Sequence, residues 1–184
     1  MIFELINHSY PKNITLKDRT QYVLRPSTKD DMEILWNFFQ EIPENDKLFL
    51  KDNVAEKDVV EAWCNSLNYE SVLPLLALHD GKLAGDATLH THHQTWIKHI
   101  GKIRVTIHPQ YRNRGLASML VKELIEIASK TDLEILDAEF MSEQESAINA
   151  FKKLGFKELA LMDQYVIDTA GKPHDYIILG YDLK

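Results

Sequence analysis

Apolar and polar residues alternate along this chain with two different periods, and these periods predict where strands and helices lie. Alternation with a period of two, or a short apolar run, predicts strands over residues 14–16, 22–24, 73–78, 83–89, 100–107, 133–140, 157–167 and 176–183. Helical spacing predicts helices over residues 32–39, 60–67, 116–128 and 147–154. The early strands are joined by short turns, whereas 100–140 reads strand, helix, strand. The order therefore predicts the α/β (α+β) class, with a single mixed, mostly antiparallel sheet flanked by helices.

Turn and capping residues divide these segments. Thr28 with Asp31, and Ser142 with Glu145, have the spacing of a capping box at the start of a helix. Residues 41–53 have no clear period and are predicted as a loop or short helix around Leu48-Phe49-Leu50. Residues 1–21 are predicted to be an N-terminal extension with a hairpin strand, and residues 22–184 one domain.

The amino-acid composition limits the classes of molecule that this protein is expected to bind. There are 28 acidic and 21 basic residues, the net charge is -7, and the basic residues are scattered, so neither nucleic acid nor an anionic membrane is an expected partner. Cys64 is the only cysteine, so no internal disulfide can form, and its helical spacing favours a core residue over a catalytic thiol. The first residues lack the pattern of a signal peptide. These features favour a cytoplasmic protein.

The most informative motif is Arg112-Asn113-Arg114-Gly115-Leu116-Ala117, between a predicted strand and an amphipathic helix. Free N–H groups at a helix N-terminus suit a pyrophosphate, and Gly115 lets backbone approach it closely. No Gly-Lys-Ser or Gly-Lys-Thr follows, which excludes a P-loop. Taken alone, the motif could also be a tight turn with two solvated arginines.

With Pro109 and Tyr111 before it and Lys153-Leu154-Gly155-Phe156 after the next helix, this motif resembles the GNAT superfamily of N-acetyltransferases. The resemblance spans about Tyr22 to Lys184. More weakly, the residues from Ile14 to Asp31 look like the start of the bacterial protein-lysine acetyltransferase group. The resemblance implies the acyl-CoA N-acyltransferase fold with a splayed central parallel strand pair, acetyl-CoA as acyl donor, and an amine, of a small molecule or a protein, as acceptor.

By the same resemblance, the thioester would lie in a V-shaped opening between the strand that ends at Ile107 and the strand that ends near Phe140. Gln144 stands where an Asn often contacts CoA, Phe151 where many members place a proton-donating Tyr, and Lys102 where several have a glutamate base. The implied cofactor-binding residues are Val105, Thr106, Ile107, Arg112, Asn113, Arg114, Gly115, Leu116, Ala117, Ser118, Gln144 and Phe151.

Transfer to an amine needs a base and an acid. Glu139 is the preferred base, since related enzymes carry a glutamate in this local pattern, although a surface or salt-bridged carboxylate is the alternative. Tyr165 is a possible acid, with a buried structural tyrosine as the alternative. No metal site is expected, because the run His90, His92, His93 places its side chains on opposite faces of a strand.

The sequence therefore predicts an acetyl-CoA-dependent N-acetyltransferase that acts on a primary amine by direct attack in a ternary complex. The rival is an acyl-CoA-binding regulatory domain without catalysis, which Phe151 and Lys102 keep open. Residues 41–53 are expected to form the acceptor side of the cleft, where their acidic side chains would favour a cationic acceptor. The acceptor, the acyl-chain preference and the oligomeric state cannot be read from the sequence.

Overall fold

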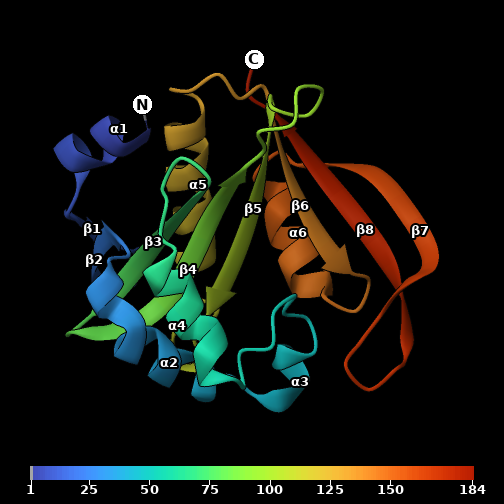
Figure 1. Cartoon of the computed structure of the whole chain (residues 1–184), viewed down its shortest axis with the longest axis horizontal. Coiled ribbons are helices and arrows are strands. Elements are labelled where there is room, and N and C mark those ends of the chain that lie inside the picture. Colours follow the sequence, from blue (N-terminus) through green and yellow to red (C-terminus); the bar gives the residue numbers. More distant parts are fainter. Residues whose placement is uncertain (1) are drawn as a thin grey trace.

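A computed structural model describes residues 2–184, apart from the side chains of residues 2, 3 and 5. Eight strands of the described chain form one sheet in the order β1-β2-β3-β4-β5-β6-β8-β7, in which only β5 and β6 are parallel (Figure 1). This confirms the predicted mixed, mostly antiparallel sheet. The strands are β1 (Lys12–Thr15), β2 (Gln21–Pro26), β3 (Val72–His79), β4 (Lys82–Thr91), β5 (Ile100–Ile107), β6 (Ile135–Met141), β7 (Lys157–Ile167) and β8 (Pro173–Asp182).

Helices cover both faces of the sheet, with α2 and α4 on one face and α5 and α6 on the other (Figure 1). Two short turns of 3-10 helix, η1 (Lys29–Asp31) and η2 (Pro109–Tyr111), precede α2 and α5. The α-helices are α1 (Ile2–Ser9), α2 (Met32–Gln40), α3 (Glu44–Lys47), α4 (Lys57–Asn65), α5 (Leu116–Ala128) and α6 (Glu145–Lys153). The helix α1 was not predicted.

The parallel pair β5 and β6 separates part of the way along its length. Ladder pairing joins Ile100–Lys102 to Ile135–Asp137, yet β5 continues to Ile107 and β6 to Met141. Beyond Lys102 the two strands diverge, and α3 lies below the widened end (Figure 1). The splayed central pair that the family resemblance implied is therefore present.

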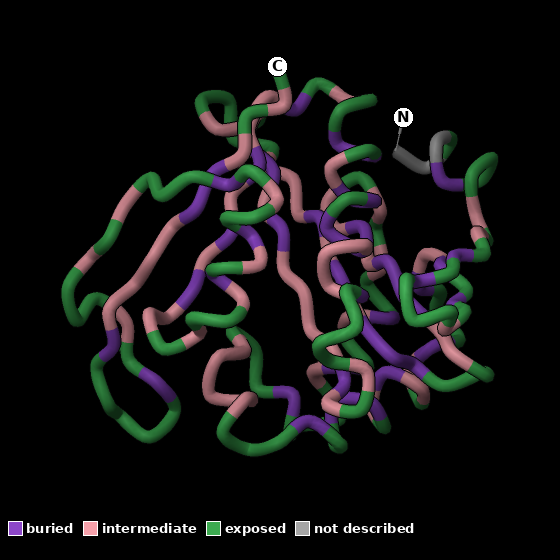
Figure 2. Tube along the Cα trace, turned by 180° about the vertical axis from the view of Figure 1, so that it is seen from behind, coloured by how far each residue is buried: buried purple, intermediate pink, exposed green. Residues whose placement is uncertain are grey.

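Alternation along the central strands separates an apolar layer from a polar one. Gly85 lies against Leu116 and Leu120 of α5, so the odd-numbered residues of β4 point to that side. The even-numbered Asp86, Thr88 and His90 point to the opposite face, toward α2 and α4. Figure 2 shows the buried residues concentrated in the central strands and the helices packed on them, with exposed residues at the rims.

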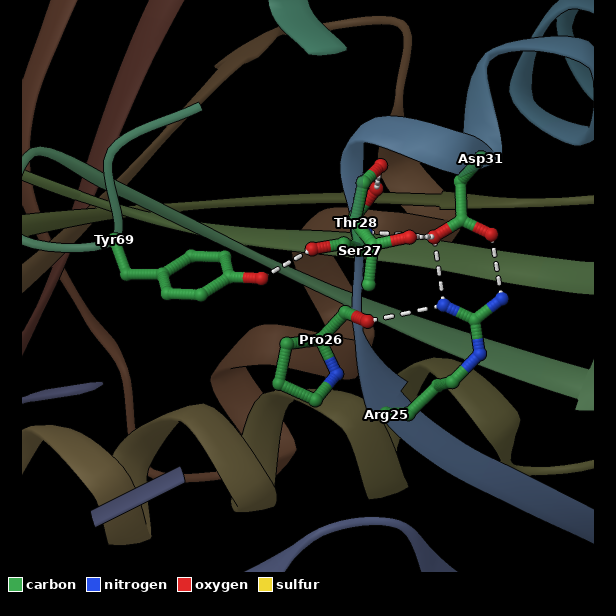
Figure 3. Close-up of polar contacts among 6 residues, drawn as sticks. All are labelled: Arg25, Pro26, Ser27, Thr28, Asp31 and Tyr69. Atoms are coloured by element: carbon green, nitrogen blue, oxygen red, sulfur yellow. Dashed lines mark hydrogen bonds and ion pairs between the residues drawn. The ribbon is translucent and has the colours of Figure 1, made fainter. Parts of the chain in front are cut away.

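The link from β2 to α2 is held by a compact polar network (Figure 3). Arg25 donates two hydrogen bonds to the Asp31 carboxylate, at 2.7 and 2.5 Å, and the Thr28 N–H donates to the same group at 2.6 Å. The hydroxyl of Tyr69 donates to the Ser27 carbonyl, which ties the segment before β3 to the same corner. Charge-assisted bonds of this kind fix the angle at which α2 leaves the sheet.

The second predicted capping box is wrong. The helix α6 begins at Glu145 with Gln144 as its N-cap, so Ser142 lies outside the helix. At the other end of the chain, β1 forms the edge strand beside β2, and Ile6 and Ile14 are buried in the main core. The predicted hairpin is confirmed, while the proposed division at residues 21 and 22 stays a prediction.

Candidate active site

A cavity of about 850 Å³ lies at the splayed strands and extends beneath α2 and α4. Its walls come from β4, β5, β6, the N-terminus of α5, the start of α6 and the segment before α4. Every residue predicted for cofactor binding lines it except Arg114, and so does Glu139. Residues spread over 47 positions of sequence, from Val105 to Phe151, thus meet at one cavity, as a single site for donor and acceptor requires.

The loop from Arg112 to Gly115 presents backbone to this cavity. Asn113 and Gly115 both take the left-handed conformation, with φ of 61° and 89°. The Met119 N–H donates to the Gly115 carbonyl at 3.0 Å and starts the hydrogen bonding of α5. The N–H groups of the preceding turn therefore lack an intrahelical acceptor, at the positive end of the helix dipole. This arrangement fits a pyrophosphate.

The two arginines of the loop differ. Arg112 donates to the Ile107 carbonyl at 3.0 Å and forms a 2.7 Å ion pair with Asp46 of α3. Arg114 lies over the Tyr111 ring, with its guanidinium 5.9 Å from the ring centroid, and its nearest carboxylate is Asp18 at 4.0 Å. Arg112 thus connects the cofactor loop to the segment 41–53, whereas Arg114 lies outside the cavity lining.

Gln144 and Phe151 line the cavity at α6. The Gln144 side-chain oxygen accepts a 2.9 Å hydrogen bond from the Met141 N–H, which fixes the turn from β6 into α6. Phe151 is buried between Phe140 and Phe156, with ring centroids 5.1 and 4.9 Å away. Phe151 offers an apolar wall and no proton.

Glu139 lies on β6 with both carboxylate oxygens engaged. One oxygen is 2.7 Å from the Lys102 ammonium on β5, across the opening, and the other contacts the Lys51 ammonium. Burial, followed by the like charges of Lys102 and Arg104, lowers the pKa of Lys51 to about 8. Glu139 therefore lines the cavity and is salt-bridged, as the alternative interpretation of the sequence held, while its role as base stays a prediction.

Asp86, Thr88 and His90 form a row of polar side chains on β4, of which the sequence had drawn attention only to His90, in the histidine run. Burial raises the pKa of Asp86 to about 7, and its Oδ1 has no hydrogen-bond partner among the described residues. Two positions along, Thr88 and His90 share a 2.9 Å hydrogen bond. Burial, with Arg104 and Lys102 nearby, lowers the pKa of His90 to about 4, so this imidazole is neutral at pH 7.

Tyr165 does not join these residues. It lies on the edge strand β7, outside the cavity lining, and is 65% exposed, so the alternative of a buried structural tyrosine is wrong. Its ring packs beside Tyr176, 5.9 Å away between centroids. Within residues 2–184, no group of three or more His, Cys, Asp or Glu side chains is placed to hold a metal ion.

The segment 41–53 lies at the cavity, and its role on the acceptor side stays a prediction. It includes the short helix α3, and residues 42, 46 and 49–52 line the cavity. Three ion pairs with lysine or arginine join the segment to the sheet and the cofactor loop: Asp46 with Arg112, Lys51 with Glu139, and Asp52 with Arg104 at 3.6 Å. Glu41 of the segment also contacts the His108 imidazole, just after β5, at 2.8 Å. The segment therefore covers the polar face of the sheet at the opening.

A model of the acetyltransferase (GNAT) family matches residues 32–156, which include the cofactor loop, both flanking strands and α6. No helix in the described residues is both long and apolar enough to cross a membrane.

Solved structures share the fold. The GNAT-family acetyltransferase from Streptococcus pneumoniae is 23% identical, with 88% of this chain and 99% of that chain covered and a TM-score of 0.75. Salmonella typhimurium yncA, solved with its cofactor acetyl-CoA, is 20% identical, with 89% and 94% covered and a TM-score of 0.76. The GNAT domain of S. lividans PAT is 17% identical, with 93% and 96% covered and a TM-score of 0.78. At these identities the likeness establishes the fold.

Proposed function

The chain belongs to the acetyltransferase (GNAT) family and is an N-acetyltransferase with acetyl-CoA as donor, and on this premise we propose that it acetylates a primary amine by direct attack within a ternary complex. One observation carries the proposal. The predicted cofactor loop and the predicted base line the same cavity, beside strands that diverge and so free backbone groups for the cofactor.

Donor binding is assigned to the loop 112–118 and to the edge of β5. The pyrophosphate would lie against the N-terminus of α5, and the pantetheine would pair with backbone at Val105, Thr106 and Ile107. Gln144 and Phe151 would contact the cofactor from α6. The free edge of β5 supports this placement, because ladder pairing with β6 stops at Lys102.

In the chemical step a neutral amine attacks the thioester carbonyl carbon, an N–C bond forms, and the C–S bond breaks to release the CoA thiolate. The amine loses a proton, which we assign to Glu139 or to water held by it, because this carboxylate lies on the strand that faces β5 across the opening. The thiolate gains a proton. Tyr165 was proposed as its donor, but its exposed position favours water.

Cys64 supports direct attack over a covalent acyl-enzyme. It is the only cysteine of the chain, and burial raises the pKa of its thiol, so the nucleophilic thiolate is disfavoured. The single cysteine also fits a reducing compartment, and we expect the enzyme to act in the cytoplasm.

The test is release of free CoA from acetyl-CoA with a panel of primary amines, against an enzyme-free control. Initial rates measured at several concentrations of both substrates should give intersecting double-reciprocal lines, as a ternary complex requires. Parallel lines would indicate a ping-pong reaction and contradict direct attack. No release above the control with any amine would leave the acyl-CoA-binding regulatory domain in its place.

A further inference from the structure

Five carboxylate side chains line the cavity, and four of them have a cationic partner. Asp46 pairs with Arg112, Asp52 with Arg104, Glu139 with Lys51 and Lys102, and Glu143 with His174 at 2.5 Å. The fifth, Asp86, forms no ion pair with any residue that the structure describes.

The lysine and arginine side chains that line the cavity are paired with carboxylates as well. Lys51, Arg104 and Arg112 each face one of the carboxylates just described, which leaves none of them for Asp86. Burial is the sole cause of the raised pKa of Asp86, so no nearby charge offsets it. Asp46, Arg104 and Glu139 also carry a buried atom without a hydrogen-bond partner, but each of these side chains has an ion-pair partner, whereas Asp86 has none. A buried carboxyl without any partner at a cavity wall indicates a group that a ligand completes.

The position of Asp86 suits an acceptor. Asp86 lies directly opposite Thr106 on β5, in the stretch assigned to the pantetheine, and adjacent strands are about 5 Å apart. On its other side it pairs with Leu76 of β3, a member of the core under α2 and α4. The carboxyl group therefore lies between the cofactor strand and an apolar region.

That apolar region is the part of the cavity lined by residues of α2, α4 and the segment between them, which we call the apolar chamber. The side chains that define it come from α2, α4 and the segment between them and are uncharged, and Leu35, Phe39, Val54 and Cys64 are buried. The charged residues that the same segment adds to the cavity, Asp46, Lys51 and Asp52, form the ion pairs described above. The chamber residues are Leu35, Phe39, Leu50, Val54, Trp63 and Cys64. A chamber of this composition excludes a polycation, whose further charges would find no partner, and accepts a hydrocarbon or an aromatic ring.

We propose that the acceptor is a primary amine on an apolar body, that the body occupies the apolar chamber, and that Asp86 binds the ammonium group. This inference rests on the proposed acetyl transfer and adds the class of amine. An ammonium group supplies the cation that the Asp86 carboxyl lacks, and the pair is charge-assisted in a buried setting. The amine is then held beside the strand assigned to the pantetheine, and before attack its ammonium form loses the proton that is assigned to Glu139 or to water held by it.

The experiment compares phenethylamine and hexylamine with spermidine and with a lysine-containing peptide, using CoA release by the full chain. The apolar amines should have the higher kcat/KM. The variant Asp86→Asn should raise the KM for phenethylamine at least about tenfold and leave the CoA Kd unchanged. Asp80→Asn is the matched control, because this exposed carboxylate lies in the turn before the same strand and should change neither constant.

Circular dichroism would reveal a folding defect in Asp86→Asn, and in that case a second variant still tests the inference. Leu50→Asp places a charge on the half-buried loop side of the apolar chamber and should raise the KM for hexylamine more than that for ethylamine. Equal or faster transfer to spermidine or the peptide, or an unchanged KM for phenethylamine in Asp86→Asn, would overturn the inference and leave acetyl transfer standing. A wild-type chain that acetylates no amine would overturn acetyl transfer itself.

Discussion

Gly115 offers the sharpest test of the cofactor loop, because the strain of a substitution there can be separated from its effect on binding. Its φ of 89° lies in the left-handed region, and a Cβ built on it would meet no atom within 4 Å. The Cβ that Gly115→Val adds therefore meets no neighbouring atom in the free protein. It places a branched side chain in the open space that the pyrophosphate is proposed to occupy.

The expected magnitudes follow from this geometry. A left-handed conformation costs an L-residue about 1–2 kcal/mol, which for a chain of this length corresponds to a fall in Tm of about 2–8 °C. Loss of charge-assisted contacts to the pyrophosphate would cost about 1.5–3 kcal/mol, or an increase of about 10-fold to 150-fold in the Kd for CoA.

Gly81 supplies the matched control. It has a φ of 77°, a Cβ there would also meet no atom within 4 Å, and it lies in the turn between β3 and β4, outside the lining of the cavity. Gly81→Val should lower the Tm by a similar amount and leave CoA binding unchanged. Calorimetric titration of both variants with CoA measures the difference. Equal Kd values for the two variants would refute the assignment of the pyrophosphate to this loop.

Three further predictions concern charge. Glu139→Gln should lower kcat by about 10²-fold or more with the CoA Kd unchanged, and unaltered turnover would remove Glu139 as base. Asp46→Asn should free Arg112 for the cofactor and tighten CoA binding in titrations, unless the pair holds the loop in its binding conformation, in which case affinity falls and the idea fails. His174→Gln should lower Tm more at pH 6 than at pH 9. Hydrogen bonds to Asp168 and Glu143 raise the pKa of His174. The protonated imidazole therefore stabilises the folded protein fully below the ordinary pKa of about 6.5, and this stabilisation is lost as the pH rises through the raised pKa. An equal loss of Tm at both pH values would contradict this.

Periodicity predicted most of the fold because burial imposed it. β5 and α5 have the predicted bounds, 100–107 and 116–128, since their apolar residues pack against each other and leave little freedom in register. The helix α1 was missed, since residues 2–9 were too short a stretch to show a helical period. Ser142 and Glu145 have the spacing of a capping box, but the turn after Met141 is closed by the Gln144 side chain, a local contact that spacing alone cannot reveal.

Part of the candidate site could likewise be predicted from the sequence, and part could not. The cofactor loop could be predicted, because helix-terminus chemistry is local in sequence: a strand, a glycine and a helix within 20 residues suffice. The surroundings of Glu139 could not, since Lys51 and Lys102 come from segments 88 and 37 residues away and meet it only through the sheet order.

Asp86 shows why a functional carboxyl can escape a sequence pattern. In Ala84-Gly85-Asp86-Ala87 it occupies the polar phase of an alternating strand, where a solvent-facing residue is the ordinary expectation. Only the tertiary structure reveals that α2 and α4 cover this face of β4, so that the polar positions of the strand face an enclosed cavity and not solvent. The same covering that makes Asp86 costly in an empty cavity excludes water competing for a bound ammonium group, and a carboxyl that is unfavourable alone becomes selective for its ligand.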